Sequence, residues 1–182
     1  SHDTVVPGVM LADSKFTGKF FKRKITMITE ATNGGRRMPK PRFEVNREWD
    51  DIVRRTEARG GVVFNASYAA SKASDRVLKS LHLGFTIVVD RLARNHMRVE
   101  LSNVIDELIK SGKVIFVEED KDHKEEAWLQ RMKFARGENG FVIIIAPSAT
   151  LNQGYAASAY APEILPGEKN SVVFTGHVFD DS

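Results

Sequence analysis

Gly60-Gly-Val-Val-Phe-Asn-Ala-Ser-Tyr-Ala-Ala70 is the segment that most clearly indicates the fold class of this chain. Its centre, Val62 to Phe64, is a short apolar run with the length and composition of a buried strand. Immediately afterwards apolar residues recur at helical spacing, and these are Ala69, Ala73, Val77, Leu78 and Leu81. An apolar strand followed at once by an amphipathic helix is the repeating unit of parallel α/β sheets.

The same alternation continues on both sides of this unit. Further strands are predicted at residues 24–29, 85–89, 114–117, 141–146 and 172–175. Further helices are predicted at residues 44–59, 101–109, 122–135 and about 155–161. Short, wholly apolar strands separated by helices pair in parallel. The sequence therefore predicts an α/β fold with a mostly parallel sheet of about six strands and helices on both faces.

Length and composition indicate a single globular unit. The chain has 182 residues, of which 42% are hydrophobic and 28% are charged, so it can bury a core. Residues 24–182 are interpreted as one domain, and the less regular residues 1–23 as an arm or a remnant of an adjoining domain. No apolar run approaches the roughly 20 residues that span a bilayer, so no membrane partner is expected.

The absence of cysteine and the small charge excess limit the chemistry. Without cysteine the chain has no disulfide, no cysteine nucleophile and no thiolate ligand for zinc. This composition fits a reducing compartment, so a cytoplasmic location is expected, or a nuclear one if the source is eukaryotic. The net charge of +3 permits a nucleic-acid partner but does not by itself indicate one.

Polar residues follow most of the predicted strands. In open parallel sheets, ligands bind beyond the carboxyl ends of the strands. The polar ends are Glu30 to Asn33, Asn65 to Ser67, Asp90 with Arg91, Ser148 to Gly154, and Thr175 to His177. They form one rim of candidate binding residues, or they simply cap helices and close turns. Phosphate-loop, nucleophile-elbow and histidine-rich zinc motifs are missing from the sequence, so it shows no complete active site.

Individual candidates have both a functional and a structural interpretation. Glu30 can fix a metal ligand or a metal-bound water, or it can cap the loop after its strand. His177 can be a ligand or a proton carrier, although a lone histidine after a strand is more often structural. Asp90 and Arg91 can form an ion pair, which contributes little if it is exposed. The basic loop of residues 36–42 can contact phosphates or be solvated.

Five short segments of the sequence resemble, in the same order along the chain, the motifs of one protein family. They are Ile28 to Gly34, Gly60 to Ala70, Phe85 to Asn95, Val142 to Gly154, and Lys169 to His177. In this order they resemble the β-CASP region of metallo-β-lactamase-fold RNA-processing nucleases. That family includes the cleavage and polyadenylation specificity factors, their archaeal relatives and RNase J. The resemblance covers about residues 24–182 and implies a Rossmann-like β-CASP domain.

The resemblance implies that this domain closes over a metallo-β-lactamase domain, with single-stranded RNA in the groove between them. In such enzymes two zinc ions activate water for attack on a phosphodiester, and most zinc ligands would lie outside this chain. Glu30 matches the acidic residue of the family's first β-CASP motif, which implies a catalytic role in support of the metal centre. The residues in matching loops, implied to bind substrate, are Asn33, Ser67, Arg91, Ser148 and His177.

The chain also departs from the family pattern. Residues 147–154 read Pro-Ser-Ala-Thr-Leu-Asn-Gln-Gly where the family has a Ser-Gly-Met loop, and His177 replaces an aromatic residue. Asp13 resembles the family's zinc-bridging aspartate and is the metal-ligand candidate within this chain. Thr17-Gly-Lys-Phe20 resembles the same motif with lysine in the ligand position, and this second alignment stays open.

The expected function is that of the β-CASP domain of a zinc-dependent ribonuclease. Such a domain grips single-stranded RNA and completes the active site in mRNA 3′-end processing or decay, and this chain alone is expected to be inactive. The alternative is a non-catalytic RNA-binding or scaffold subunit of an RNA-processing complex. Beyond RNA and the metallo-β-lactamase domain, the expected partners are a second copy of the chain, in a homodimer, or subunits of a processing complex. An unrelated Rossmann-like domain for a nucleotide or sugar phosphate is disfavoured because the first turn is not glycine-rich.

Overall fold

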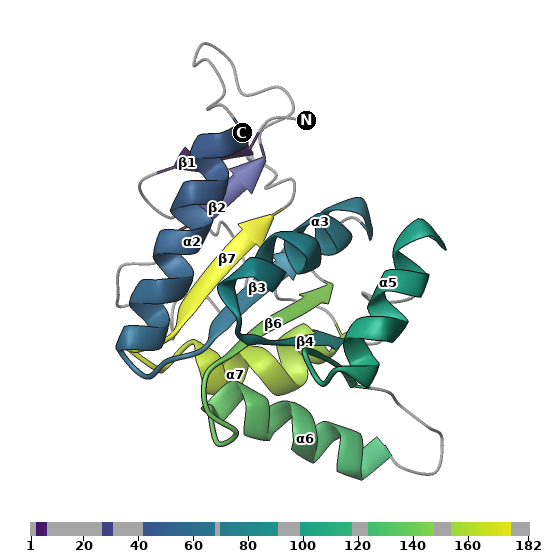
Figure 1. The fold of residues 1–182 in the computed structure, drawn as a ribbon. Coiled ribbons are helices and arrows are strands. Elements are labelled where there is room, and N and C mark those ends of the chain that lie inside the picture. The colour runs from purple at the N-terminus through teal and green to yellow at the C-terminus, as the bar shows by residue number, and fades with distance from the viewer. Residues whose placement is uncertain are drawn as a thin grey trace.

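In the computed structural model, the described residues are 3–6, 27–30, 42–67, 70–90, 99–117, 124–147 and 154–175. They contain a five-stranded sheet in which all neighbouring strands are parallel, in the order β5-β4-β6-β3-β7 (Figure 1). Its strands are β3 (Val63–Ser67), β4 (Thr86–Asp90), β5 (Val114–Val117), β6 (Val142–Pro147) and β7 (Ser171–Thr175). The predicted α/β class with a parallel sheet is confirmed.

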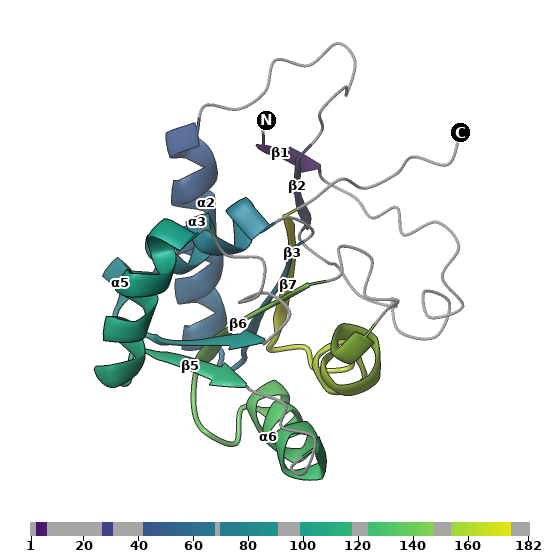
Figure 2. The same cartoon turned by 90° about the vertical axis from the view of Figure 1, so that its right-hand side faces the viewer.

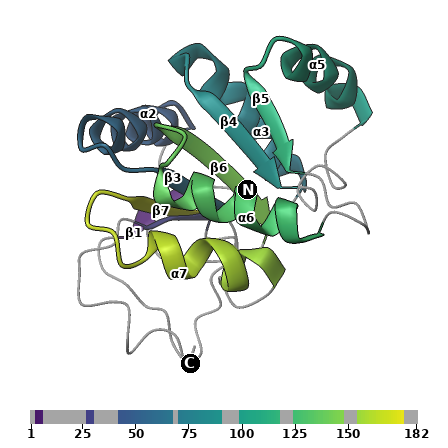
Figure 3. The same cartoon turned by 90° about the horizontal axis from the view of Figure 1, so that it is seen from below.

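Helices cover both faces of this sheet (Figures 2 and 3). One face carries α2 (Arg42–Ala58), α3 (Ala70–Ser80) with the 3-10 turn η1 (Leu81–Leu83), and α5 (Val99–Lys110). The other face carries α6 (Lys124–Arg136), the π-helical turn η2 (Ala156–Tyr160) and α7 (Ala161–Ile164). Among the helices described, none has both the length and the apolar character needed to cross a membrane.

The strands are apolar on both sides because both sides are buried. Alternate residues of a strand point to opposite faces, so Phe64 and Ile144 pack with α6 and α7 while Val63 and Ile143 pack with α2 and α3. The most apolar strand, β6, lies in the centre of the sheet, and its residues 142–146 are all buried. A central strand of a parallel sheet requires such a continuous apolar run.

Asn170 ties together the starts of β3 and β7. Its side-chain Oδ1 accepts a hydrogen bond from the Val62 backbone N–H at 3.0 Å, and its Nδ2 donates to the Ile164 carbonyl at 3.0 Å. The Ser171 N–H donates to the Val62 carbonyl, also at 3.0 Å. Asn170 therefore connects the end of α7 to the first residues of two neighbouring strands.

The first predicted strand forms, but outside the parallel sheet. Strand β2 (Met27–Glu30) pairs antiparallel with β1 (Asp3–Val6) in a separate two-stranded sheet, and it lies next to β7 (Figure 1). The parallel sheet therefore has five strands, where about six were expected. The pattern of residues 24–29 predicts a strand correctly, but the pattern of one segment does not identify the partner that completes its hydrogen bonds. The boundary at residue 23 stays a prediction.

Candidate functional site

The carboxyl ends of the parallel strands lie along one edge of the sheet. At this edge Ser67 of β3 is in register with Pro147 of β6 on one side and with Thr175 of β7 on the other. Asp90, the last residue of β4, is in register with Val117 of β5. The parallel sheet therefore brings the described ends of β3, β4 and β7 to one edge, whereas Glu30 ends β2 in the separate two-stranded sheet.

The order of the strands places a topological switch point at this edge. After β3 and β4 the chain passes to the face of α3 and α5, whereas after β5 and β6 it passes to the face of α6 and α7. Strand β6 lies between β3 and β4, so neighbouring strands send their connections to opposite faces. Ligands of open α/β sheets bind at such a switch point. The ends of β3, β6 and β4 are therefore the candidate site.

A buried ion pair lies at the end of β4. The Nε of Arg131, from α6, donates to Oδ2 of Asp90 at 2.8 Å, and the two side chains are 0% and 1% exposed. The Tyr160 hydroxyl donates to the same carboxylate oxygen at 3.3 Å. The guanidinium carbon of Arg131 lies 3.7 Å from the ring centroid of Tyr155. The pair thus contacts the helical segment that follows β6.

These four residues, the Asp90 cluster, are suited to holding a strand end in place. Burial raises the pKa of the Tyr160 hydroxyl well above its usual value and the Asp90 carboxylate raises it further, so the hydroxyl stays protonated and donates to Asp90. Within the described part of the chain, the Nη atoms of Arg131 are buried without a hydrogen-bond partner. The face of the Tyr155 ring supplies an attractive contact to this guanidinium.

Ser67 and Asn65 lie on the opposite side of the sheet from the Asp90 cluster. They alternate with residues that face α6 and α7, so they point toward the layer of α2 and α3. Ser67 is 3% exposed and Asn65 is fully buried, and both take part in interactions. Ser67 is therefore at the predicted edge but covered, and its contact with substrate stays a prediction.

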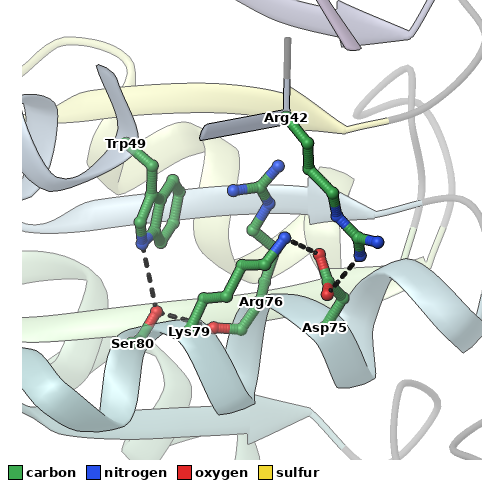
Figure 4. A network of polar contacts seen from close by, with 6 residues as sticks. All are labelled: Arg42, Trp49, Asp75, Arg76, Lys79 and Ser80. Atoms are coloured by element: carbon green, nitrogen blue, oxygen red, sulfur yellow. Dashed lines mark hydrogen bonds and ion pairs between the residues drawn. The ribbon is translucent and has the colours of Figure 1, made fainter. Parts of the chain in front are cut away.

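Between α2 and α3, two cations share one carboxylate and a third lies beside them (Figure 4). Asp75 accepts a hydrogen bond from Arg42 Nη2 at 2.8 Å and one from Lys79 Nζ at 2.6 Å. The guanidinium carbon of Arg76 lies 5.3 Å from the ring centroid of Trp49. The Arg42 side chain is 74% exposed whereas Arg76 is 2% exposed. This basic cluster therefore runs from the core to the surface.

The basic cluster also joins the two helices to each other. Trp49 Nε1 donates to Ser80 Oγ at 3.2 Å, and Ser80 Oγ donates to the Arg76 carbonyl at 2.7 Å (Figure 4). Because α3 begins just after the carboxyl end of β3, the contact of Arg42 with Asp75 lies near that edge. The three cations of this cluster outnumber its one carboxylate, and such a group suits an anionic partner such as a phosphate.

Glu30, the predicted catalytic residue, is the last residue of β2. It is in register with Asp3 of β1, so two acidic residues are opposite each other in the two-stranded sheet. Strand β2 also lies beside β7, the edge strand that is in register with β3. These are backbone positions, and the role of Glu30 at a metal centre stays a prediction.

The other predicted site residues lie outside the described residues, and they are Asp13, Asn33, Arg91, Ser148 and His177. Their contacts with substrate or metal stay predictions. Over the described ranges, no three acidic or histidine side chains are grouped so that they could hold a metal ion. The described residues therefore do not by themselves fit a zinc site.

Arg131 was not predicted as the partner of Asp90. The sequence pairs Asp90 with its neighbour Arg91 as a candidate ion pair, but in the structure its carboxylate is bound by a residue 41 positions further along the chain. A signal was present in α6, where Arg131 falls in the buried stripe formed with Ala127, Phe134 and Ala135. An arginine within an apolar helical stripe indicates a buried charge that needs a partner.

No protein-family model matches this chain, and no curated protein matches its sequence. The class defined by the fold is an α/β domain with a five-stranded parallel sheet and a switch point at its carboxyl edge.

Proposed function

We propose that the chain is the β-CASP domain of a zinc-dependent ribonuclease with the metallo-β-lactamase fold. In this role it grips single-stranded RNA and completes the active site for phosphodiester hydrolysis in mRNA 3′-end processing or decay. The proposal is supported by the positions in the fold of four sequence segments that resemble the family. Those that contain Ser67, Asp90, Pro147 and Thr175 each hold a strand of the same sheet, and all these strands end at one edge.

The residue types of the proposed contacts suit an RNA partner. Arginine, serine, asparagine and histidine side chains are common contacts to phosphate and base edges. The proposed RNA-binding residues are Asn33, Ser67, Arg91, Ser148 and His177. The basic cluster of Arg42 and Lys79 adds positive charge nearby. Single strands are bound by a positively charged groove that follows the backbone.

The metal chemistry is proposed to come mainly from the adjoining metallo-β-lactamase domain. Zinc held by that domain would supply an activated water for hydrolysis of the phosphodiester. From this chain, Asp13 is the candidate ligand and Glu30 is proposed to fix a ligand or a metal-bound water. Under this proposal the chain alone binds RNA without cleaving it.

The test is fluorescence anisotropy of a labelled single-stranded RNA titrated with the chain across a salt series. The affinity is expected to fall as salt rises, because binding releases counterions from the RNA. Arg91→Ala should weaken binding and Glu30→Ala should not. Lys133→Ala is the matched control, since Lys133 is an exposed cation in the last turn of α6. Its removal should leave the affinity unchanged.

Each outcome separates the candidate functions. Binding weakened by Arg91→Ala alone supports a groove that grips RNA and a separate role for Glu30. No binding at low salt contradicts the proposed function. Robust cleavage by the chain alone contradicts the proposal that the adjoining domain supplies the metal chemistry. A thermal shift with free nucleotides but not with RNA would favour a small-ligand Rossmann-like domain instead.

A non-catalytic scaffold subunit is the second candidate. It is favoured by the loop of residues 147–154, which lacks the Ser-Gly-Met sequence of the family. The sequence of any domain that adjoins this chain in the full-length gene product would distinguish the two candidates. An H-x-H-x-D-H motif in an adjoining domain, with zinc bound in stoichiometric amounts, favours the nuclease. An adjoining domain without these histidines favours the scaffold.

A further inference from the structure

Phe43, in the first turn of α2, is 67% exposed, more than any other large hydrophobic residue among those described. The others that are exposed are Leu78 at 40%, Val104 at 41% and Leu129 at 46%. A single exposed apolar side chain is ordinary on a protein surface. An exposed ring between cations is a more specific feature, because it has the chemistry of a stacking platform for bases.

Two arginines flank Phe43. Arg42 precedes it with a side chain that is 74% exposed, and Arg47 is exposed one turn further along the helix. Residues four apart lie on the same face of a helix, so Phe43 and Arg47 share one side of α2. Arg42 is held in position by its ion pair with Asp75 at 2.8 Å.

The first turns of α2 carry charges of both signs, because Arg42 and Arg47 lie in the same segment as Glu44, Glu48, Asp50 and Asp51. Asp50 is paired with His82 at 2.9 Å, and Glu44 is partly buried. Asp75 brings one negative charge, which is shared between Arg42 and Lys79. Within this mixed surface, the exposed ring of Phe43 lies between two exposed arginines, Arg42 and Arg47.

The position of this surface connects it to the candidate site. Helix α2 leads through a short turn into β3 and runs in the opposite direction, so its first turn lies toward the carboxyl edge of the sheet (Figure 1). Arg42 reaches Asp75 of α3, the helix that begins just after β3 ends at Ser67. A nucleic-acid strand bound at that edge can extend to Phe43.

We propose that Phe43, Arg42 and Arg47 form a platform on which one unpaired base of single-stranded RNA stacks. The arginines contact the phosphates on either side of that base. The inference rests on the proposed RNA-binding function and adds a contact surface beyond the strand ends. A phenyl ring accepts the face of any base, so the platform contributes affinity without sequence preference.

The experiment measures the dissociation constant for a fluorescein-labelled oligouridylate by anisotropy at low salt. Phe43→Ala is expected to weaken binding about fivefold or more. Phe43→Trp should retain the affinity and add tryptophan quenching beyond that of the native tryptophans. Leu129→Ala removes an exposed apolar side chain from the opposite layer and should leave the affinity unchanged. Circular dichroism verifies that each variant is folded.

An abasic oligonucleotide of the same length separates stacking from charge. Phe43→Ala should leave the affinity for this probe unchanged, whereas Arg47→Ala should weaken the binding of both oligonucleotides. If wild type binds RNA but Phe43→Ala binds equally well, the platform is wrong and the RNA-binding proposal stands. Equal losses in Phe43→Ala and Leu129→Ala also overturn the platform. If wild type binds no RNA at all, the proposed function itself fails, and the platform fails with it.

Discussion

Gly61 lies directly against the backbone of Lys169, and a Cβ atom on Gly61 would overlap the Lys169 carbonyl. The same Cβ would be 2.9 Å from the backbone nitrogen of Asn170. Gly60, just before it, has φ of +68° after the end of α2, a conformation that glycine adopts without strain. The paired glycines thus have structural roles. One lets the helix end, and the other lets β3 begin beside β7.

Replacing Gly61 with alanine is expected to lower the free energy of unfolding by about 1–3 kcal/mol or more, because packed backbone must move apart. Gly84→Ala is the control. Gly84 has φ of +78°, and no other atom lies within 4 Å of the place where its methyl group would be, so only backbone strain applies there. That strain is about 1 kcal/mol. Urea unfolding followed by circular dichroism measures both, and an unaffected Gly61→Ala variant would contradict the close approach.

Removing one partner of the buried ion pair should be more damaging than removing both. Arg131→Met leaves the Asp90 carboxylate buried without its cation, which is expected to lower the free energy of unfolding by about 3–5 kcal/mol. The double variant with Asp90→Leu should recover part of this loss, because neither charge remains buried. A double-mutant cycle from urea unfolding gives the coupling energy. Additive losses would show that the two residues act independently.

Tyr160 should make the fold sensitive to alkaline pH. Its pKa is raised in the folded protein by burial and by Asp90, so folding favours the neutral phenol. The resulting stability is complete below the ordinary pKa of 10.0 and is lost as the pH rises above it. The free energy of unfolding should therefore fall above about pH 10, and less steeply in Tyr160→Phe. Identical slopes in the two proteins would refute this linkage.

An acid-sensitive contact joins α6 to α7. Arg136 donates from Nε and Nη2 to the two carboxylate oxygens of Glu163, both at 2.8 Å. These hydrogen bonds hold the pKa of Glu163 below its usual value of 4.5. The stability that they contribute is present above that value and is lost as the pH falls through the folded-state pKa.

The expected result is a pH-dependent effect of Glu163→Gln on thermal unfolding. The variant should melt below wild type near neutral pH, and the difference should close as the pH falls through the folded-state pKa of Glu163. The size of the effect should be modest because Arg136 is 46% exposed. Glu57→Gln, at an exposed position of α2, is the control. A constant difference across this pH range would argue against the contact.

Local patterns predict the individual elements well. In α2 the helical spacing of Val45, Trp49, Ile52 and Val53 predicts an apolar stripe, and all of these residues are buried. The apolar run at residues 141–146 predicts the most hydrophobic strand, and it forms the centre of the sheet as β6. Both patterns are repeats within one segment, so they require no knowledge of the partner.

The candidate site is predicted only in part. The carboxyl edge follows from parallel pairing, and it does bring the end of β3 beside the ends of β6 and β7. The pairing of Asp90 with Arg131 was not predicted, because a buried contact between distant segments leaves no repeat in the sequence. The 67% exposure of Phe43 could not be predicted from the sequence either, because an aromatic residue at the start of a helix is equally consistent with burial.

Patterns within single segments are enough to predict the alternation of strands and helices, the parallel class and the edge at which polar residues collect. Those features depend on the period of apolar residues and on the rule that apolar strands need cover on both faces. The order β5-β4-β6-β3-β7, the antiparallel pairing of β2 with β1 and the ion pair of Arg131 with Asp90 are set by the folded chain. They depend on which surfaces and charges complement one another, and such complementarity arises only when distant segments pack together.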